Sequence, residues 1–195
     1  MTKKSLGEIA ELTAGVIIQR ILANSDFGEE IYVLVPKAIH DGMLDEEALS
    51  IERRSYNLSE QQYDKFLIED GEIAMKFSSP YDACKVARKN HTKSLLVPSF
   101  CCKIKVTDPN IDADYLVAFL NSSTCKKELD EKCHTRTINL IRKSDLETIM
   151  VPLLPKDEQI KISERYMNIL KLKKAVSTLM ELEDERNTVL FNGED

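Results

Sequence analysis

The chain has 195 residues, of which 43% are hydrophobic, and this is enough for one packed domain with an appendage. Its formal charge of −6 argues against a protein that binds nucleic acid nonspecifically over its whole surface, so any contact with DNA must be local. Its apolar stretches have the length of strands and it opens without a secretory signal, which predicts a cytoplasmic protein with no membrane span.

Residues 1–154 show a short, mixed periodicity that predicts an irregular α+β domain with a mixed sheet. Strands are expected where apolar runs of strand length occur, at Ile31–Val35, Glu72–Phe77, Leu95–Val106 and Thr148–Leu153. The turn signals between them are Asp41-Gly42, Asp70-Gly71 and Asp108-Pro109-Asn110. The clearest helix is expected at Asp112–Leu120, and weaker helical pieces at Ser59–Phe66 and Ser122–Lys132.

Residues 155–195 have a different character and predict one long helix. Pro155 and the acidic residues that follow it are typical of a helix start, and no further glycine or proline occurs until Gly193. A helix from Pro155 to Leu190 would be about 50 Å long at 1.5 Å per residue. Its apolar residues follow the spacing of a coiled-coil seam, at Ile162, Ile169, Leu172, Val176 and Leu179.

Such a seam needs a partner, because each large aliphatic side chain left in water forgoes about 1.5–3 kcal/mol. The seam could pack on its own domain, on a second copy of the chain or on another protein. The length of the helix favours the last two.

Four pieces of the sequence carry a family resemblance when they are taken in order. The most specific is the junction Ile149–Ile162, where a strand ends in Val-Pro-Leu-Leu-Pro and is followed by Glu-Gln and an amphipathic helix. The other three are Leu6–Leu12, Glu69–Lys76 and Asp114–Ser122. Together they resemble the specificity subunit of type I restriction-modification systems.

The resemblance implies a non-catalytic subunit in which residues 1–154 form a target-recognition domain that reads half of a split DNA target. Residues 155–195 would form a helix that spaces two such domains, mediates dimerisation and docks the methyltransferase subunits. Members of the family carry two recognition domains and two helices, so this chain resembles a half-length form. Two copies with antiparallel helices would read an interrupted palindrome, with their domains about a helix length apart. Phe77–Ala83 departs from the family pattern, since many members have a glycine-rich turn there.

Residues able to contact DNA gather in three segments. Phosphates are bound by Lys, Arg and hydroxyl groups, and base edges are read by Arg, Lys, Asn, Gln or Ser on exposed loops. The candidates are Arg53, Arg54, Lys89, His91, Lys93, Arg136 and Asn139. Each alone could be an ordinary solvated side chain. As groups they stand out in an otherwise acidic chain.

The sequence offers little for catalysis, so the reaction is expected from methyltransferase and restriction subunits. Cys133 and His134 are adjacent, but adjacency does not make a nucleophile and its base. Cys101 and Cys102 are consecutive, so on a strand they point to opposite faces and do not form a zinc-ligand pair. Without nucleotide, S-adenosylmethionine or metal signatures, no cofactor is expected. The rival hypotheses are a helical adaptor that does not read DNA and a Cys/His hydrolase.

Overall fold

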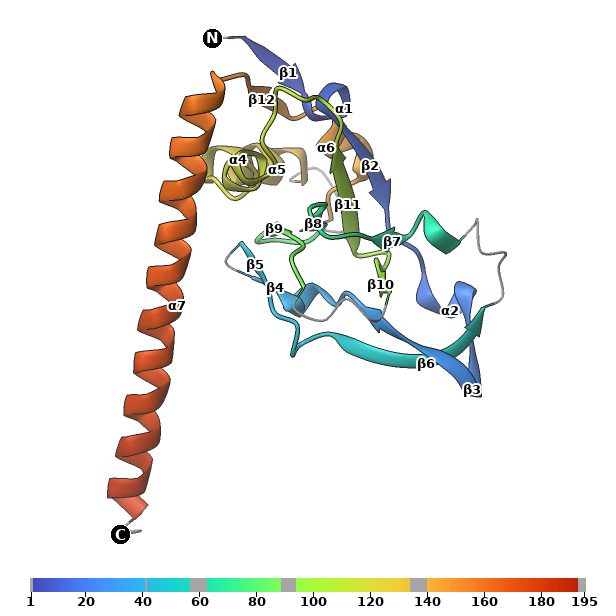
Figure 1. The fold of residues 1–195 in the computed structure, drawn as a ribbon, viewed down its shortest axis with the longest axis vertical. Helices are drawn as coiled ribbons and strands as arrows, with labels where there is room; N and C mark the ends of the chain where they lie inside the picture. The colour runs from blue at the N-terminus through green and yellow to red at the C-terminus, as the bar shows by residue number, and fades with distance from the viewer. Residues whose placement is uncertain (1, 41, 57–62, 89–93, 134–139, 193–195) are drawn as a thin grey trace.

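The computed structural model describes residues 2–40, 42–56, 63–88, 94–133 and 140–192, and only the backbone of residues 20–29, 53–56 and 192. These residues form an α+β domain with the 37-residue helix α7 (Lys156–Asn192) along one side, as Figure 1 shows. The N-terminus lies near the start of α7, and the C-terminus lies at the far end of the helix. The fold class and the long C-terminal helix that the sequence predicts are confirmed.

The central sheet is antiparallel, and its strand β8 (Ile73–Lys76) is buried on both faces. Its strands are, in spatial order, β2 (Ala10–Ala14), β11 (Cys101–Val106), β8 and β9 (Ala83–Lys85). Cys102 packs with Ile104 in the larger core, and Cys101 packs with Ala74 in a second core. The prediction that the two cysteines point to opposite faces is therefore confirmed. Burial on both faces explains why β8 reads as a nearly continuous apolar run.

A second sheet lies beside the first. Its strands are, in spatial order, β6 (Ser50–Tyr56), β3 (Leu22–Val33), β10 (Leu95–Leu96) and β7 (Leu67–Ile68). The single strand expected at Leu95–Val106 is wrong, because β10 and β11 belong to different sheets. The chain turns between them, where the Cys101 amide donates to the Pro98 carbonyl at 2.9 Å. Proline has no amide hydrogen for a sheet ladder, so the strand cannot continue through Pro98.

Short elements close the domain where α7 leaves it. β1 (Lys3–Ser5) pairs antiparallel with β12 (Met150–Pro152), so the start of the chain holds the strand that precedes α7. The helices beside this pair are α1 (Leu6–Ile9), α4 (Ala113–Leu120), α5 (Ser123–Cys133) and α6 (Lys143–Glu147). The remaining elements are α2 (Ile18–Ile21), the 3-10 helix η1 (Pro36–Ala38), β4 (Ile39–His40) and β5 (Met43–Leu44).

Two predicted helices and three predicted turns match the structure. The Asp112 carboxylate caps α4 by accepting from the Tyr115 amide at 2.9 Å, and the predicted Ser122–Lys132 helix corresponds to α5. Gly42 turns the chain between β4 and β5 with φ at 74°, and Gly71 turns it before β8 with φ at 90°. The Asp108–Asn110 turn connects β11 to α4. Most of the helical piece expected at Ser59–Phe66 lies outside the described residues.

Candidate DNA interface and helix seam

The seven predicted DNA-contacting residues belong to three segments, and only one of these is described. Arg53 and Arg54 lie in β6, where Arg53 pairs with Glu30 of β3. The register of this strand pair shifts beside Arg54, between Asn24 and Glu29. Only the backbone of these arginines is described. The other five candidates, which lie outside the described residues, are Lys89, His91, Lys93, Arg136 and Asn139.

Ser94, which follows the segment 89–93, is held by the same sheet as β6. The Tyr32 amide donates to the Ser94 carbonyl at 3.0 Å, and the next residue along the chain, Leu95, pairs with Tyr32. On its other side Tyr32 pairs with Ile51, two residues before Arg53. The second sheet therefore brings Ser94 and Arg53 near each other, although they are 41 positions apart in the sequence.

The residues that flank the segment 134–139 attach to a different part of the domain. Leu140 forms an isolated bridge with Ser78, and the Ile141 amide donates to the Phe77 carbonyl at 2.9 Å. Phe77 directly follows β8 of the central sheet. Ser94 thus attaches the end of the segment 89–93 to the sheet that contains β6, whereas the described flank of the segment 134–139 attaches beside β8 of the central sheet. The convergence of all three on one concave face stays a prediction.

Two cations of the basic stretch from Lys85 to Lys93 have acidic partners in the domain. The Lys85 ammonium forms an ion pair with the carboxylate of Asp114 in α4. The Arg88 Nε lies 3.3 Å from Oδ1 of Asp70, and its side chain is largely buried. These partners neutralise charge that would otherwise attract phosphate. Lys85 and Arg88 are therefore weak candidates for contact with phosphate.

A charged network holds the loop that departs from the family pattern, Phe77–Ala83. The buried Asp82 carboxylate accepts hydrogen bonds from the Lys76 and Lys126 ammonium groups, each at 2.7 Å. Burial alone would raise the pKa of Asp82, but the hydrogen bonds from Lys126 and Lys76 outweigh it and lower that pKa below its ordinary value. Asp82 therefore stays ionised. These two ion pairs tie the loop to β8, which carries Lys76, and to α5, which carries Lys126.

The cysteines are poor candidates for catalysis. Burial raises the pKa of the Cys84, Cys101, Cys102 and Cys125 thiols to about 12, so these thiols stay protonated at neutral pH. Cys133 is buried at the end of α5, and its sequence neighbour His134 lies outside the described residues. Within the described ranges, no group of three His, Cys, Asp or Glu side chains is arranged to hold a metal ion.

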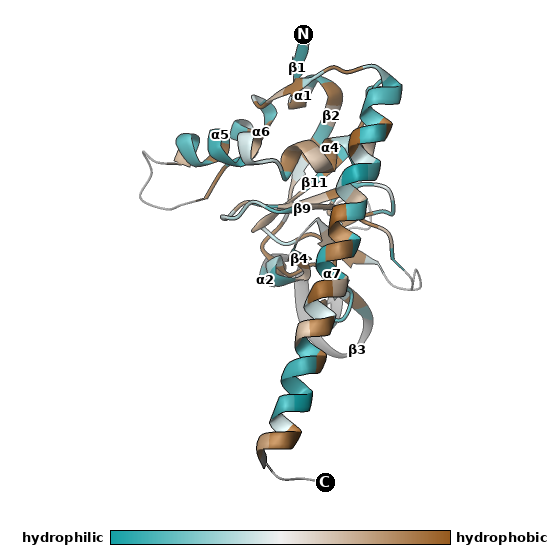
Figure 2. Cartoon of the chain, turned by 90° about the vertical axis from the view of Figure 1, so that its left-hand side faces the viewer, coloured by the Kyte–Doolittle hydropathy of each residue, from teal (hydrophilic) through white to brown (hydrophobic). Residues whose placement is uncertain are grey.

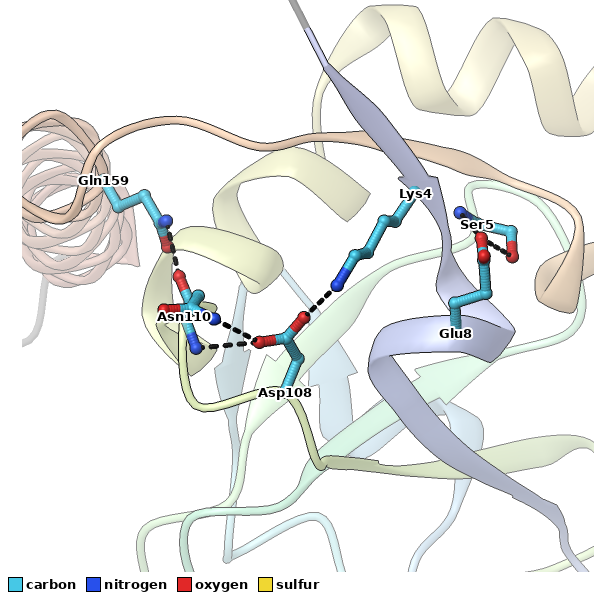
Figure 3. A network of polar contacts seen from close by, with 6 residues as sticks. All are labelled: Lys4, Ser5, Glu8, Asp108, Asn110 and Gln159. Atoms are coloured by element: carbon cyan, nitrogen blue, oxygen red, sulfur yellow. Dashed lines mark hydrogen bonds and ion pairs between the residues drawn. The ribbon is translucent and has the colours of Figure 1, made fainter.

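A polar network fixes the start of α7 against the domain, as Figure 3 shows. Gln159 is fully buried, and its Nε2 donates to the carbonyls of Asn110 and Leu154, each at 2.8 Å. Its Oε1 accepts from the Asp112 amide at 2.8 Å. The Lys4 ammonium and the Asn110 amide both donate to the Asp108 carboxylate, so the N-terminal strand joins the same network. The sequence predicts only that Gln159 lies in the first helical turn and does not reveal this anchoring role.

The next turns of α7 continue this attachment with apolar contacts. Tyr166 packs against the larger core and Leu170 is only 2% exposed, while Ser163 is buried between them and Gln159. Gly42 lies so close to the helix that a Cβ atom there would collide with Tyr166 and Leu170. We call the residues Gln159, Ser163, Tyr166 and Leu170 the seat of α7. They recur every three or four residues and so form one stripe on the helix.

The predicted seam divides into one residue that packs on the domain and four that are exposed. Ile162 packs against the larger core of its own chain. The other four have exposed fractions from 52% to 67%, and they are Ile169, Leu172, Val176 and Leu179. Figure 2 shows hydrophobic segments in the middle of α7 and at its end. None of the helices in the described part of the chain has an apolar run adequate for crossing a membrane.

Comparison with known proteins gives matches to solved structures only. No protein-family model matches the sequence, and no curated protein matches it. The HsdS subunit from Thermoanaerobacter tengcongensis matches with a TM-score of 0.60 and 13% identity, over 91% of this chain and 39% of that chain. The type I restriction-modification S subunit from M. genitalium matches with a TM-score of 0.55 and 17% identity, over 100% of this chain and 46% of that one.

A third match, at a TM-score of 0.59 and 14% identity, comes from a structure that explains complex assembly and conformational transition of the type I R-M system. It covers 98% of this chain and 43% of the other. The chain therefore spans less than half the length of the solved chains that it matches. Its fold, including the long helix, is that of type I restriction-modification specificity subunits, as the four sequence pieces predict.

Proposed function

We propose that this chain is the DNA-recognition subunit of a type I restriction-modification system and catalyses no reaction itself. The observation that carries the proposal is the likeness to specificity subunits over at least 91% of the chain, which includes both the mixed-sheet domain and the long helix. The buried, protonated thiols agree with a non-catalytic role. The protein would act on double-stranded DNA in the cytoplasm and direct methyltransferase and restriction subunits to it.

The recognition role belongs to residues 1–154. The shared sheet of Ser94 and Arg53 supports a DNA surface near β6, to which the segment 89–93 would contribute. The segment 134–139, which carries Arg136 and Asn139, would form a second contact region. Most contacts would be with phosphates, as is usual in protein–DNA interfaces.

The assembly role belongs to residues 155–195, which pair two copies of the chain and dock the methyltransferase. Four exposed aliphatic residues along one face of α7 favour this assignment, because covering them with a second helix removes apolar surface from water. Two copies related by a twofold axis present two recognition domains. Such a dimer reads a bipartite target in which each chain recognises one half.

The decisive experiment is co-expression of this chain with a methyltransferase subunit encoded beside it, followed by sequencing of the methylated genome. We expect the two proteins to co-purify and a new bipartite motif to be methylated. The matched control is the methyltransferase subunit expressed alone, which should leave that motif unmodified. Co-purification without sequence-specific methylation or DNA binding would contradict the proposal and favour a helical adaptor.

A further inference from the structure

The exposed face of α7 carries opposite charges at its two ends as well as aliphatic residues between them. Ile169 and Val176 take the first position of a heptad, and Leu172 and Leu179 take the fourth. In the same frame Arg165 falls at a fourth position and Glu183 at a first position. The side chains of both are exposed. The seam therefore has a basic residue before its apolar centre and an acidic one after it.

We propose that a second copy of this chain packs on the seam as an antiparallel helix in one register. In this register, seam residues at equal distances before and after position 174 face each other, while the side chain of Lys174 itself points away from the seam. The inference rests on the proposed function and specifies the partner surface. Ile169 then faces Leu179 of the partner subunit, and Leu172 faces Val176 of the partner subunit. At each end of this apolar centre, Arg165 faces Glu183 of the partner subunit. The symmetry of the pair produces two such contacts between opposite charges.

Neighbouring registers lose this match. A shift by one heptad in one direction places Leu172 against Glu183 and Ile169 against Arg186. A shift in the other direction leaves Arg165 against Val176. Each alternative buries charged groups against the exposed aliphatic side chains at the centre of the seam, which costs free energy because the charge loses water without gaining a partner. In the register proposed here, the comparable contact is at the edge, where Arg186 faces Ile162 of the partner subunit. The register centred on Lys174 pairs all four exposed aliphatic residues with one another.

The charges also distinguish antiparallel from parallel packing. In a parallel pair in register, Glu183 would face its own copy and Arg165 would face its own copy, so like charges would meet in two layers. Antiparallel packing converts both layers into contacts between opposite charges. Among the described residues, Glu183 forms a surface ion pair with Arg186, at 3.6 Å with both side chains mostly exposed. Such a pair contributes little and does not prevent contact with a partner.

The seat of α7 is compatible with this dimer. At about 100° per residue, the seam lies about 130° around the helix from the seat, so a second helix can approach without displacing the domain. Figure 1 shows the domain on one side of α7 only. The seat is neither on the seam nor opposite it, so each domain lies to one side of the plane that contains the two helices. A twofold axis perpendicular to that plane therefore places both domains on the same side of it. The two seats then lie about 28 Å apart along the helix axis.

Charge reversal combined with mixing tests the register. We expect Glu183→Arg and Arg165→Glu, each alone, to raise the Kd of the dimer roughly tenfold or more, because two opposite-charge contacts become like-charge contacts. An equimolar mixture of the two variants should form heterodimers with the Kd of the unmodified protein, since both contacts are again between opposite charges. The measurement is sedimentation equilibrium over a concentration series.

Matched controls change the same charge elsewhere on the helix. Glu185→Arg and Lys174→Glu lie away from the seam and should leave the Kd of the dimer unchanged within about twofold. An unmodified protein that dimerises but does not respond to either reversal, or a mixture that fails to recover affinity, overturns the register while the proposed dimer stands. An unmodified protein that stays monomeric contradicts the homodimer itself and with it the partner proposed here.

Discussion

Leu170 and Leu172 lie two positions apart in the same helix, yet the first is 2% exposed and the second 67% exposed. The first belongs to the seat, where α7 packs on its own domain. The second belongs to the seam, which is turned away from that domain. Both residues have the same chemistry and nearly the same neighbours in sequence. The difference shows that one helix serves two interfaces, one within the chain and one that is open to a partner.

The largest effect is expected when the seam is disrupted while the seat is left intact. Replacing Leu172 and Val176 together with Glu should raise the Kd of the dimer by roughly three orders of magnitude, because four charged groups would enter its apolar centre. Specific binding to a bipartite DNA site should be lost with the dimer. Sedimentation measures the first effect, and binding to a DNA duplex with both half-sites measures the second. A double variant that still dimerises would exclude the seam as the interface.

A substitution in the seat should instead lower the stability of the folded chain. In the monomeric double variant, Leu170→Ala should lower the free energy of unfolding by about 2–4 kcal/mol, because it leaves a cavity against the domain. The matched substitution Leu179→Ala removes the same atoms from an exposed position and should change it by no more than about 0.5 kcal/mol. Urea denaturation provides both values. Equal effects would show that the two leucines do not differ in burial.

The polar part of the seat should contribute a smaller amount. Gln159→Ala removes hydrogen bonds to Asn110, Leu154 and Asp112, so it should lower the free energy of unfolding by about 1–3 kcal/mol. Glu164→Ala, on an exposed part of the same helix, serves as the control and should have a much smaller effect. Hydrogen exchange at the first turns of α7 should accelerate in the Gln159 variant. Unchanged exchange would mean that Gln159 does not anchor the helix.

The smallest predicted effect concerns DNA and leaves both helix interfaces untouched. Lys89→Ala or Lys93→Ala should weaken binding to all DNA sequences by roughly threefold to tenfold and reduce the salt dependence by about one phosphate contact. Lys156→Ala, at the start of α7, is the control and should retain the affinity. Fluorescence anisotropy at several salt concentrations gives these quantities. Unchanged affinity in both lysine variants would remove the segment 89–93 from the DNA surface.

The periodicity of the sequence predicts several elements of this fold correctly. The long helix is expected from Pro155 to Leu190 and runs from Lys156 to Asn192, because proline and acidic residues favour a helix start and no breaker follows until Gly193. The opposite faces of Cys101 and Cys102 follow from the alternation of side chains in a strand. These features depend on residues close together in the chain.

The periodicity of the sequence could not predict the turn between β10 and β11 at Pro98. It also could not predict the acidic partners of Lys85 and Arg88. A continuous apolar run from Leu95 to Val106 is compatible with one strand, and only the assignment of its two ends to different sheets reveals the turn. Lys85 and Arg88 resemble DNA-binding residues in sequence, but Asp114 and Asp70 neutralise them in the fold. Those acids lie 29 and 18 residues away, where no local pattern connects them.

By itself, the sequence determined that this protein has a mixed-sheet domain followed by one long helix with an apolar seam, since such patterns repeat over a few residues. Only the tertiary structure decided which side of that helix the domain covers. Gln159 reaches carbonyl and amide groups of Asn110 and Asp112, 49 and 47 residues earlier in the chain, and Leu170 closes over Gly42. Burial depends on segments that are distant in sequence, so the division of α7 into seat and seam appears only after the chain has folded.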